Sequence, residues 1–281
     1  MTLIRLIFGR KMNSIAAAVQ LELAKNLESY FARTEFDFVD KTQVKLLRDQ
    51  ISPVYLRTAP LVAIDVEAYE RAQLKVTEIG VAVYDPQGQW LLPTPQIKTL
   101  HILSKENIRL HNGTYVPDRK YYFNGGTSYS MTARELQTLL DLIFSHYLKE
   151  RSGILVGHDV KGDIKWLSKL GIQVAPNTPT VDTLKIYQLT TRQNGSLRKI
   201  LRRMNIPHAN LHNAANDAYY TLLAALSICD PEQRRRSELD SVDTEELPTL
   251  TKREKFKAKF SDEVTVCGMK EAPSASDFIA M

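Results

Sequence analysis

Five titratable residues stand where a predicted strand or helix begins or ends, and the first two form a pair. Asp65 and Glu67 follow the apolar run Val62–Ile64. Because alternate residues of a strand point to the same face, the two carboxylates project together. Two like charges side by side in a buried place are costly unless a cation neutralises them. The pair predicts a cation site, and the alternative is two acids solvated at a strand end.

Two further acids and a histidine stand at predicted helix starts. Asp163 follows the short apolar strand ILVGH, and Asp217 lies in the first turns of a long helix, with His212 just before it. Acids at helix N-termini are also favoured by the helix dipole, and His212 could be a simple helix cap. Four carboxylates that converge would suit a hard divalent ion such as Mg²⁺ or Mn²⁺. The lone histidine would then serve as a base.

Three blocks of the chain, in order, resemble the Exo I, Exo II and Exo III motifs of the DEDDh exonucleases, the DnaQ-like branch of the ribonuclease H-like fold. They read AIDVEAYE with TEIGVAVYD, then VGHDVKGDIKWL, then LHNAANDAYYTLLAAL, within residues 60–228. The Asp-x-Glu of Exo I falls on Asp65 and Glu67, and the Exo II aspartate falls on Asp163. The His-x4-Asp spacing of Exo III falls on His212 and Asp217. More narrowly, the chain resembles divergent fungal members of the family.

The resemblance implies a 3′–5′ exonuclease with two bound Mg²⁺ (or Mn²⁺) ions, about 3.5–4 Å apart. Asp65, Glu67, Asp163 and Asp217 would hold the ions, and His212 would take a proton from the attacking water. The implied substrate is single-stranded RNA or DNA, shortened to nucleoside monophosphates. Two other functions stay open, namely an inactive nucleic-acid-binding or adaptor protein and a hydrolase of small nucleotides or dinucleotides.

The sequence departs from the family pattern in three places. Ala68 stands where many relatives have a small polar residue, and Asp159 stands where asparagine is common. The segment 104–130 is expected to be a loop, longer than in the smallest members of the family. Asp182, in TVDTL, is interpreted as structural and not as a metal ligand.

Two segments carry candidate nucleic-acid contacts. The predicted helix 196–206 has basic residues on one side, and the segment 112–123 places aromatic residues among basic ones. Basic groups bind phosphates and aromatic rings stack on unpaired bases. The alternatives are a solvated helix face and a loop fixed to the core by its aromatic side chains. The candidates are Arg198, Arg202, Tyr121 and Tyr122.

The predicted elements give an α/β fold of the ribonuclease H-like type, a mixed sheet flanked by helices. Strands are expected at 60–67, 75–85 and 96–103 as an antiparallel meander, and at 153–159 and 178–187. Helices are expected at 130–150, 161–171, 196–206 and 213–228. This domain is predicted at 55–229. Residues 1–54 form a predicted helical extension, and residues 230–281 a charged tail expected to be disordered.

Composition and charge favour an intracellular protein with a polyanionic partner. Hydrophobic residues make up 43% of the chain and no apolar run is long enough to span a bilayer, so no membrane partner is expected. With two cysteines, a reducing compartment is expected. The net charge of +5 divides into +8 before Asp230 and −3 from there on. We expect the cytoplasm or nucleus, with the acid-poor, basic residues 1–21 suggesting a mitochondrial presequence as a further alternative. The sequence indicates no particular protein partner.

Overall fold

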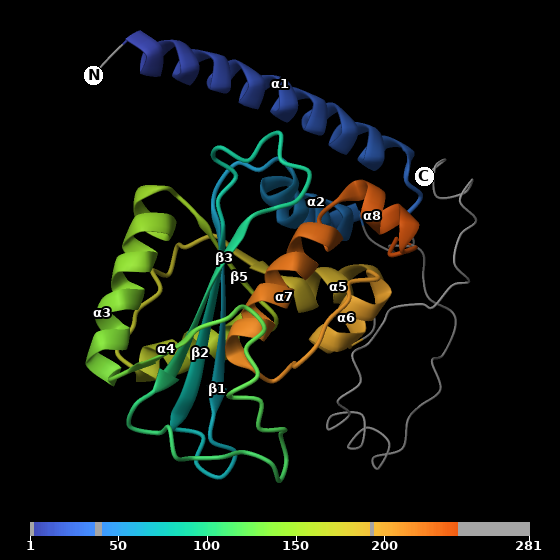
Figure 1. The fold of residues 1–281 in the computed structure, drawn as a ribbon. Helices are drawn as coiled ribbons and strands as arrows, with labels where there is room; N and C mark the ends of the chain where they lie inside the picture. The colour runs from blue at the N-terminus through green and yellow to red at the C-terminus, as the bar shows by residue number, and fades with distance from the viewer. Residues whose placement is uncertain (1–2, 37–40, 192–193, 241–281) are drawn as a thin grey trace, which may run out of the picture.

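The computed structural model describes residues 3–36, 41–191 and 194–240, with side chains from residue 15 onward, and shows a six-stranded mixed sheet between helices (Figure 1). The order of the strands is β4-β3-β2-β1-β5-β6. The antiparallel pairs are β1 with β2 and β2 with β3, and the parallel pairs are β1 with β5, β5 with β6, and β3 with β4. This arrangement confirms the predicted fold class. The strands are β1 Leu61–Ala68, β2 Val76–Tyr84, β3 Ile97–Ser104, β4 Ser128–Met131, β5 Ile154–Gly157 and β6 Thr180–Asp182.

Strand β1 divides its side chains between two hydrophobic cores. Leu61 and Ala63 pack in the core with the long helix α7 (Ala214–Ile228). Val62 and Ile64 pack on the other face, against α3 (Ala133–Phe144) and α4 (Val160–Lys169). Since side chains alternate along a strand, Asp65 and Glu67 continue the α7 face.

Three further helices cover the α7 face of the sheet. They are α2 (Lys41–Tyr55), α5 (Thr183–Thr191) and α6 (Leu197–Arg203) (Figure 1). On the other face, α3 runs directly into the π-helical segment η1 (Ser145–Glu150). Thr132 caps α3 and forms a reciprocal capping box with Glu135.

A glycine lets α7 approach the sheet beside the acidic pair. Gly80 of β2 lies opposite Asp65 in the β1–β2 register. A Cβ atom on Gly80 would lie 2.0 Å from the carbonyl oxygen of Ala214, so no other residue fits without moving the helix. The first turn of α7 therefore rests on β2 next to Asp65.

Two predicted segments differ from the structure. The strand expected at 178–187 is only three residues long, because the Oδ1 atom of Asp182 accepts the backbone N–H of Leu184 and the chain turns into α5. The segment 104–130 was expected to be a loop, but Ser128–Met131 at its end forms β4 beside β3. The side chains of β4 are largely exposed, so no apolar alternation marked this strand in the sequence.

The N-terminal helices and the residues after α7 pack together. Helix α1 (Leu3–Arg33) lies across one end of the molecule (Figure 1), and its Tyr30 is fully buried. The charged tail was predicted from residue 230, but residues 231–236 form α8 (Pro231–Arg236), capped by Asp230. Arg234 of α8 is fully buried, so the first part of this segment belongs to the folded domain. Residues 241–281, including the rest of the predicted tail, lie outside the described residues.

Among the described residues, no helix is both long and apolar enough to cross a membrane.

Candidate active site

The fold brings the five motif residues together at the end of β1. Asp163, in the first turn of α4, accepts the backbone N–H of Val66 at 3.2 Å, which ties α4 to β1 between the two acids of that strand. Glu67, His212 and Asp217 each offer a ligand atom, and these atoms all lie within 4.8 Å of one another. Asp65 lies close enough to the other three acids to feel their charges. One strand and two helix starts thus build a single cluster.

The cluster concentrates negative charge in a place that water reaches poorly. Desolvation, followed by the charges of Asp163 and Asp217, raises the pKa of Asp65 well above its usual value. Burial raises the pKa of Asp163 to about 7 and that of Asp217 to about 7 as well. The Oδ2 atom of Asp65 and the Oδ1 atom of Asp217 are buried and have no hydrogen-bond partner within the part of the chain that the structure describes. Orphaned carboxylate oxygens of this kind fit a hard divalent cation.

His212 occupies a strained turn before α7. Its φ of 70° lies in the left-handed region, which non-glycine residues rarely adopt. Its backbone N–H donates to Oδ2 of Asp217 at 3.0 Å, and the next residue, Asn213, caps α7. Strain at such a position is typical of functional sites.

Glu78 is a buried acid beside the site that the sequence analysis did not select. It lies opposite Glu67 in the β1–β2 register and is 4% exposed. Its Oε2 atom is 3.1 Å from Nε2 of His101 and accepts the Asn213 side-chain amide at 3.3 Å. Through this bond to Asn213, the N-cap residue, Glu78 fixes the start of α7 against β2. A single acid within the apolar strand TEIGVAV was the signal in the sequence.

Asp159 and Asp182 support the Exo II segment. Asp159, at the N-cap position of α4, has a left-handed backbone with a φ of 63°. The Oδ1 atom of Asp182 accepts the backbone N–H of Asp159 at 3.1 Å. This contact aligns the start of α4, and with it Asp163, which supports the structural interpretation of Asp182.

The two aromatic candidates in the loop are exposed, while the loop that carries them is fixed. Tyr121 and Tyr122 are 62% and 54% exposed. The Arg119 guanidinium lies 5.4 Å from the ring centroid of Tyr122. Lys120 is buried, and its ammonium group donates to the carbonyl oxygens of Ile108 and Leu110. Lys120 therefore fixes the loop, and the rings of Tyr121 and Tyr122 do not, which leaves these two rings open to solvent.

The two basic candidates lie on α6. Arg198 is partly buried, and Arg202, one turn further along the helix, is exposed. Burial and then the charge of Arg202 lower the pKa of Arg198, while the Asp217 carboxylate opposes this shift. Arg198 thus lies within electrostatic range of the carboxylate cluster.

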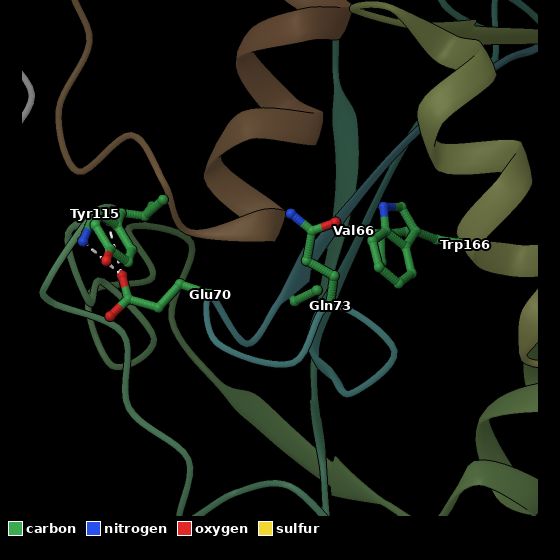
Figure 2. Close-up of a pocket in the computed structure, with 7 residues that line it drawn as sticks. Val66, Glu70, Gln73, Tyr115 and Trp166 are labelled. Carbon is green, nitrogen blue, oxygen red and sulfur yellow. Dashed lines mark hydrogen bonds between the residues drawn. The ribbon is translucent and has the colours of Figure 1, made fainter.

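A pocket of about 440 Å³ lies at the C-terminal end of β1, between that strand, α4 and the loop after β3 (Figure 2). Trp166 of α4 stands at one side and Tyr115 at the other, and Figure 2 shows Gln73 between them. Glu70 fixes the second wall, because its carboxylate accepts the backbone N–H groups of residues 114, 115 and 116 at 2.9, 2.7 and 3.1 Å. The lining residues are Val66, Ala68, Glu70, Gln73, Tyr115, Val116 and Trp166.

The fold and the order of the motifs define a ribonuclease H-like domain of the exonuclease class. Residues 60–228 match the family described as "DNA polymerase III subunit epsilon-like, C-terminal domain", and the chain belongs to this DEDDh family, as predicted.

Two fungal relatives and one solved structure show how far the similarity extends. The chain is 32% identical to the Saccharomyces cerevisiae "Good for full DBP5 activity protein 2", over 77% of this chain and 42% of that protein. It is 34% identical to an uncharacterized nucleolar protein of Schizosaccharomyces pombe, over 56% of this chain and 64% of that protein. The chain therefore spans less than half of the first relative. The zinc-bound E. coli exonuclease I complex with single-stranded DNA is similar over 64% of this chain and 42% of its own, with 10% identity and a TM-score of 0.40.

Proposed function

We propose that this protein is a metal-dependent 3′–5′ exonuclease that shortens single-stranded RNA or DNA to nucleoside monophosphates. The observation that carries the proposal is the convergence of four carboxylates, two of them with buried, unpartnered oxygen atoms, beside His212. Burying carboxylates side by side is costly, and a bound cation would remove this cost by neutralising their charge.

The carboxylates of Asp65, Glu67, Asp163 and Asp217 would hold two Mg²⁺ or Mn²⁺ ions, with Asp65 in the centre of the cluster. When bound, the ions would lower the pKa of a water molecule and neutralise the charge that develops on the leaving 3′ oxygen. His212, which is only partly buried and has a ring nitrogen within 4.8 Å of ligand atoms of Glu67 and Asp217, would accept the proton from that water. An imidazole with a pKa near 6.5 is suited to this at neutral pH.

The pocket at the end of β1 would hold the terminal nucleotide. Its volume of about 440 Å³ falls in the range of small-molecule sites, roughly 300–1,000 Å³. The Trp166 indole offers a face on which a base can stack, and the Gln73 amide offers both a donor and an acceptor for a base edge. Val66 and Ala68, which flank Glu67 in the sequence, line the pocket, so the pocket lies at the same end of β1 as the carboxylates.

The exposed groups outside the pocket favour a single-stranded nucleic acid, and not a small nucleotide, as the substrate. Tyr121 and Tyr122 can stack on further bases, and Arg198 and Arg202 can contact phosphates. The single-stranded DNA named for the E. coli exonuclease I complex is in line with such a substrate. The nucleolar name of the S. pombe relative favours the nucleus as the compartment.

Oligonucleotides of single-stranded RNA and DNA, labelled at the 5′ end, test the proposal. Each is incubated with Mg²⁺, Mn²⁺ or EDTA, with the native protein and with Asp217→Ala. We expect a metal-dependent ladder that shortens from the 3′ end and is absent with the variant. Binding of either polymer without any cleavage by the native protein would contradict the proposal and leave an adaptor protein.

A further inference from the structure

A set of buried amides joins the loop that follows β3 to the turn that carries His212. The loop runs beside the start of α7 (Figure 1). Backbone groups within its residues 119–124 form hydrogen bonds with the side chains of two asparagines of the motif itself, Asn213 and Asn216. Both asparagines are buried, at 0% and 2% exposure. The loop and the Exo III motif therefore share one network.

Both N–H donors and the carbonyl oxygen of the Asn216 side chain are bonded in this network. Its Oδ1 atom accepts the backbone N–H of Asn124 at 2.9 Å. Its Nδ2 group donates to the carbonyl oxygen of Tyr122 at 2.9 Å and to that of Asn210 at 3.0 Å. An asparagine amide has two N–H donors and one carbonyl acceptor, so every group finds a partner. An amide that is satisfied and buried in this way has one low-energy position.

The bond from Asn216 to Asn210 closes the turn that holds His212. Asn210 and His212 both have left-handed backbones, with φ of 54° and 70°. A left-handed backbone is unfavourable for most non-glycine residues and persists where the surroundings fix it. The backbone N–H of Asn216 also donates to Oδ1 of Asn213, at 3.1 Å. Asn216 thus holds the turn on one side and the loop on the other.

Asn213 makes a second attachment between the same two segments. Its Nδ2 group lies 3.0 Å from the carbonyl oxygen of Arg119 and 3.3 Å from that of Lys120. The outward-facing side chains of this part of the loop include Tyr121 and Tyr122. The backbone of the loop is therefore fixed against α7 while its rings face solvent.

We infer that Asn216 is a positioning residue. It fixes the turn that carries His212 and the loop residues 119–124, which would bind the nucleic acid, in one arrangement relative to each other. The inference rests on the proposed function, in which His212 acts on the water and the loop holds the strand. Asn216 does not touch the reacting atoms. Its effect is to keep the His212 imidazole at a constant position relative to the bound nucleic acid.

The variant Asn216→Asp tests the inference, since it keeps the size and the acceptor but loses both donors. The matched control is Asn107→Asp in the loop after β3, which adds the same charge; the Asn107 amide donates to the carbonyl oxygen of Val76, in β2, at 2.8 Å. Activity is measured on a 5′-labelled 12-mer and on the p-nitrophenyl ester of thymidine 5′-monophosphate. We expect kcat to fall at least tenfold on both substrates for Asn216→Asp, with a smaller change in KM, and to stay unchanged for Asn107→Asp.

Hydrogen exchange gives a readout that does not depend on activity. Loss of the Asn216 donors should speed amide exchange both in residues 119–124 and in residues 208–214, with the core of α7 still protected. Unchanged exchange in either segment would overturn the inference, as would a native kcat for Asn216→Asp. If the native protein cleaves nothing, the proposed function fails, while exchange still decides the coupling. If Asn216→Asp does not fold, Asn216→Ser, which retains one donor, replaces it in the same measurements.

Discussion

Two buried clusters of ionisable groups lie at opposite ends of α7. In one of them a cation pairs with an anion, and in the other carboxylates lie beside carboxylates. At the C-terminal end, Arg234 donates to Asp240 at 2.6 Å, to the Tyr30 hydroxyl at 2.8 Å and to the Ile228 carbonyl at 2.8 Å. Tyr30 in turn donates to Asp240 at 2.7 Å. A cation and an anion neutralise each other there, and the hydrogen bonds join α1 to α8.

At the N-terminal end, acids face acids. Asp65 and Asp217 each retain a buried oxygen atom without a partner among the described residues, and both have a raised pKa. In the first cluster every charge has its partner within the chain, whereas the second keeps buried carboxylate oxygens without a partner among the described residues, which fits the cation site proposed for it. Buried charges paired within the chain thus stabilise the fold, whereas buried charges left unpaired fit a binding site.

The largest predicted effect on stability concerns the first of these clusters. Replacing Arg234 by Met would leave Asp240 without its cation, and breaking a buried ion pair on one side costs about 3–5 kcal/mol. Chemical denaturation should show a loss of this size. Arg236→Met, which removes an exposed pair with Glu232, should change the free energy of unfolding by less than about 1 kcal/mol. Equal stability of the two variants would refute the structural role of Arg234.

The second cluster, of carboxylates, should respond in the reverse sense. We expect Asp65→Asn to lower kcat at least about 10³-fold, which corresponds to about 4 kcal/mol at the transition state. Without divalent cations the same variant should be as stable as the native protein or more so, because one repelling charge is gone. Asp141→Asn, on the exposed side of α3, is the control for both measurements. Lower stability of Asp65→Asn in EDTA would contradict the comparison.

A smaller effect is predicted in the pocket at the end of β1. Trp166→Ala should raise KM for a single-stranded oligonucleotide about tenfold, because a stacked base contributes about 1–3 kcal/mol. Kinetics with 5′-labelled substrate measure this. Trp90→Ala, in the turn after β2, removes the other tryptophan and should leave KM at the native value. A tenfold rise in both variants would show that the pocket has no specific part in binding.

Most of the sheet and the acidic cluster could be predicted from the sequence because their signals are local. The run Val62–Ile64 marks a buried strand, and the spacing of Asp65 and Glu67 places both on one face. His212 and Asp217 are recognisable because the helix that follows them is strongly apolar. The roles of these residues stay a prediction, whereas family and fold are confirmed.

What the sequence did not reveal depends on contacts between distant segments. Arg234 stands in a run of charged residues, and one of the partners that hold it in the core, Tyr30, lies more than 200 residues earlier. Asn216 looked like one more polar residue at a helix start, because its partners Tyr122 and Asn124 lie about 90 residues away. Helical periodicity and residue type carry no information about such partners.

The most direct test of the central claim is thermal unfolding as a function of pH, with EDTA and with Mg²⁺. Asp163 and Asp217 have a pKa of about 7 in the folded protein and about 3.9 when unfolded. Between about pH 4 and pH 7 the folded state therefore binds more protons than the unfolded state, so stability without metal should fall over this range and be lower at pH 8 than at pH 5. Mg²⁺ should restore the midpoint at pH 8 and have little effect at pH 5, and Asp217→Asn should weaken both trends. A midpoint in EDTA that is no lower at pH 8 than at pH 5, with no response to Mg²⁺, would contradict a divalent-cation site at this cluster.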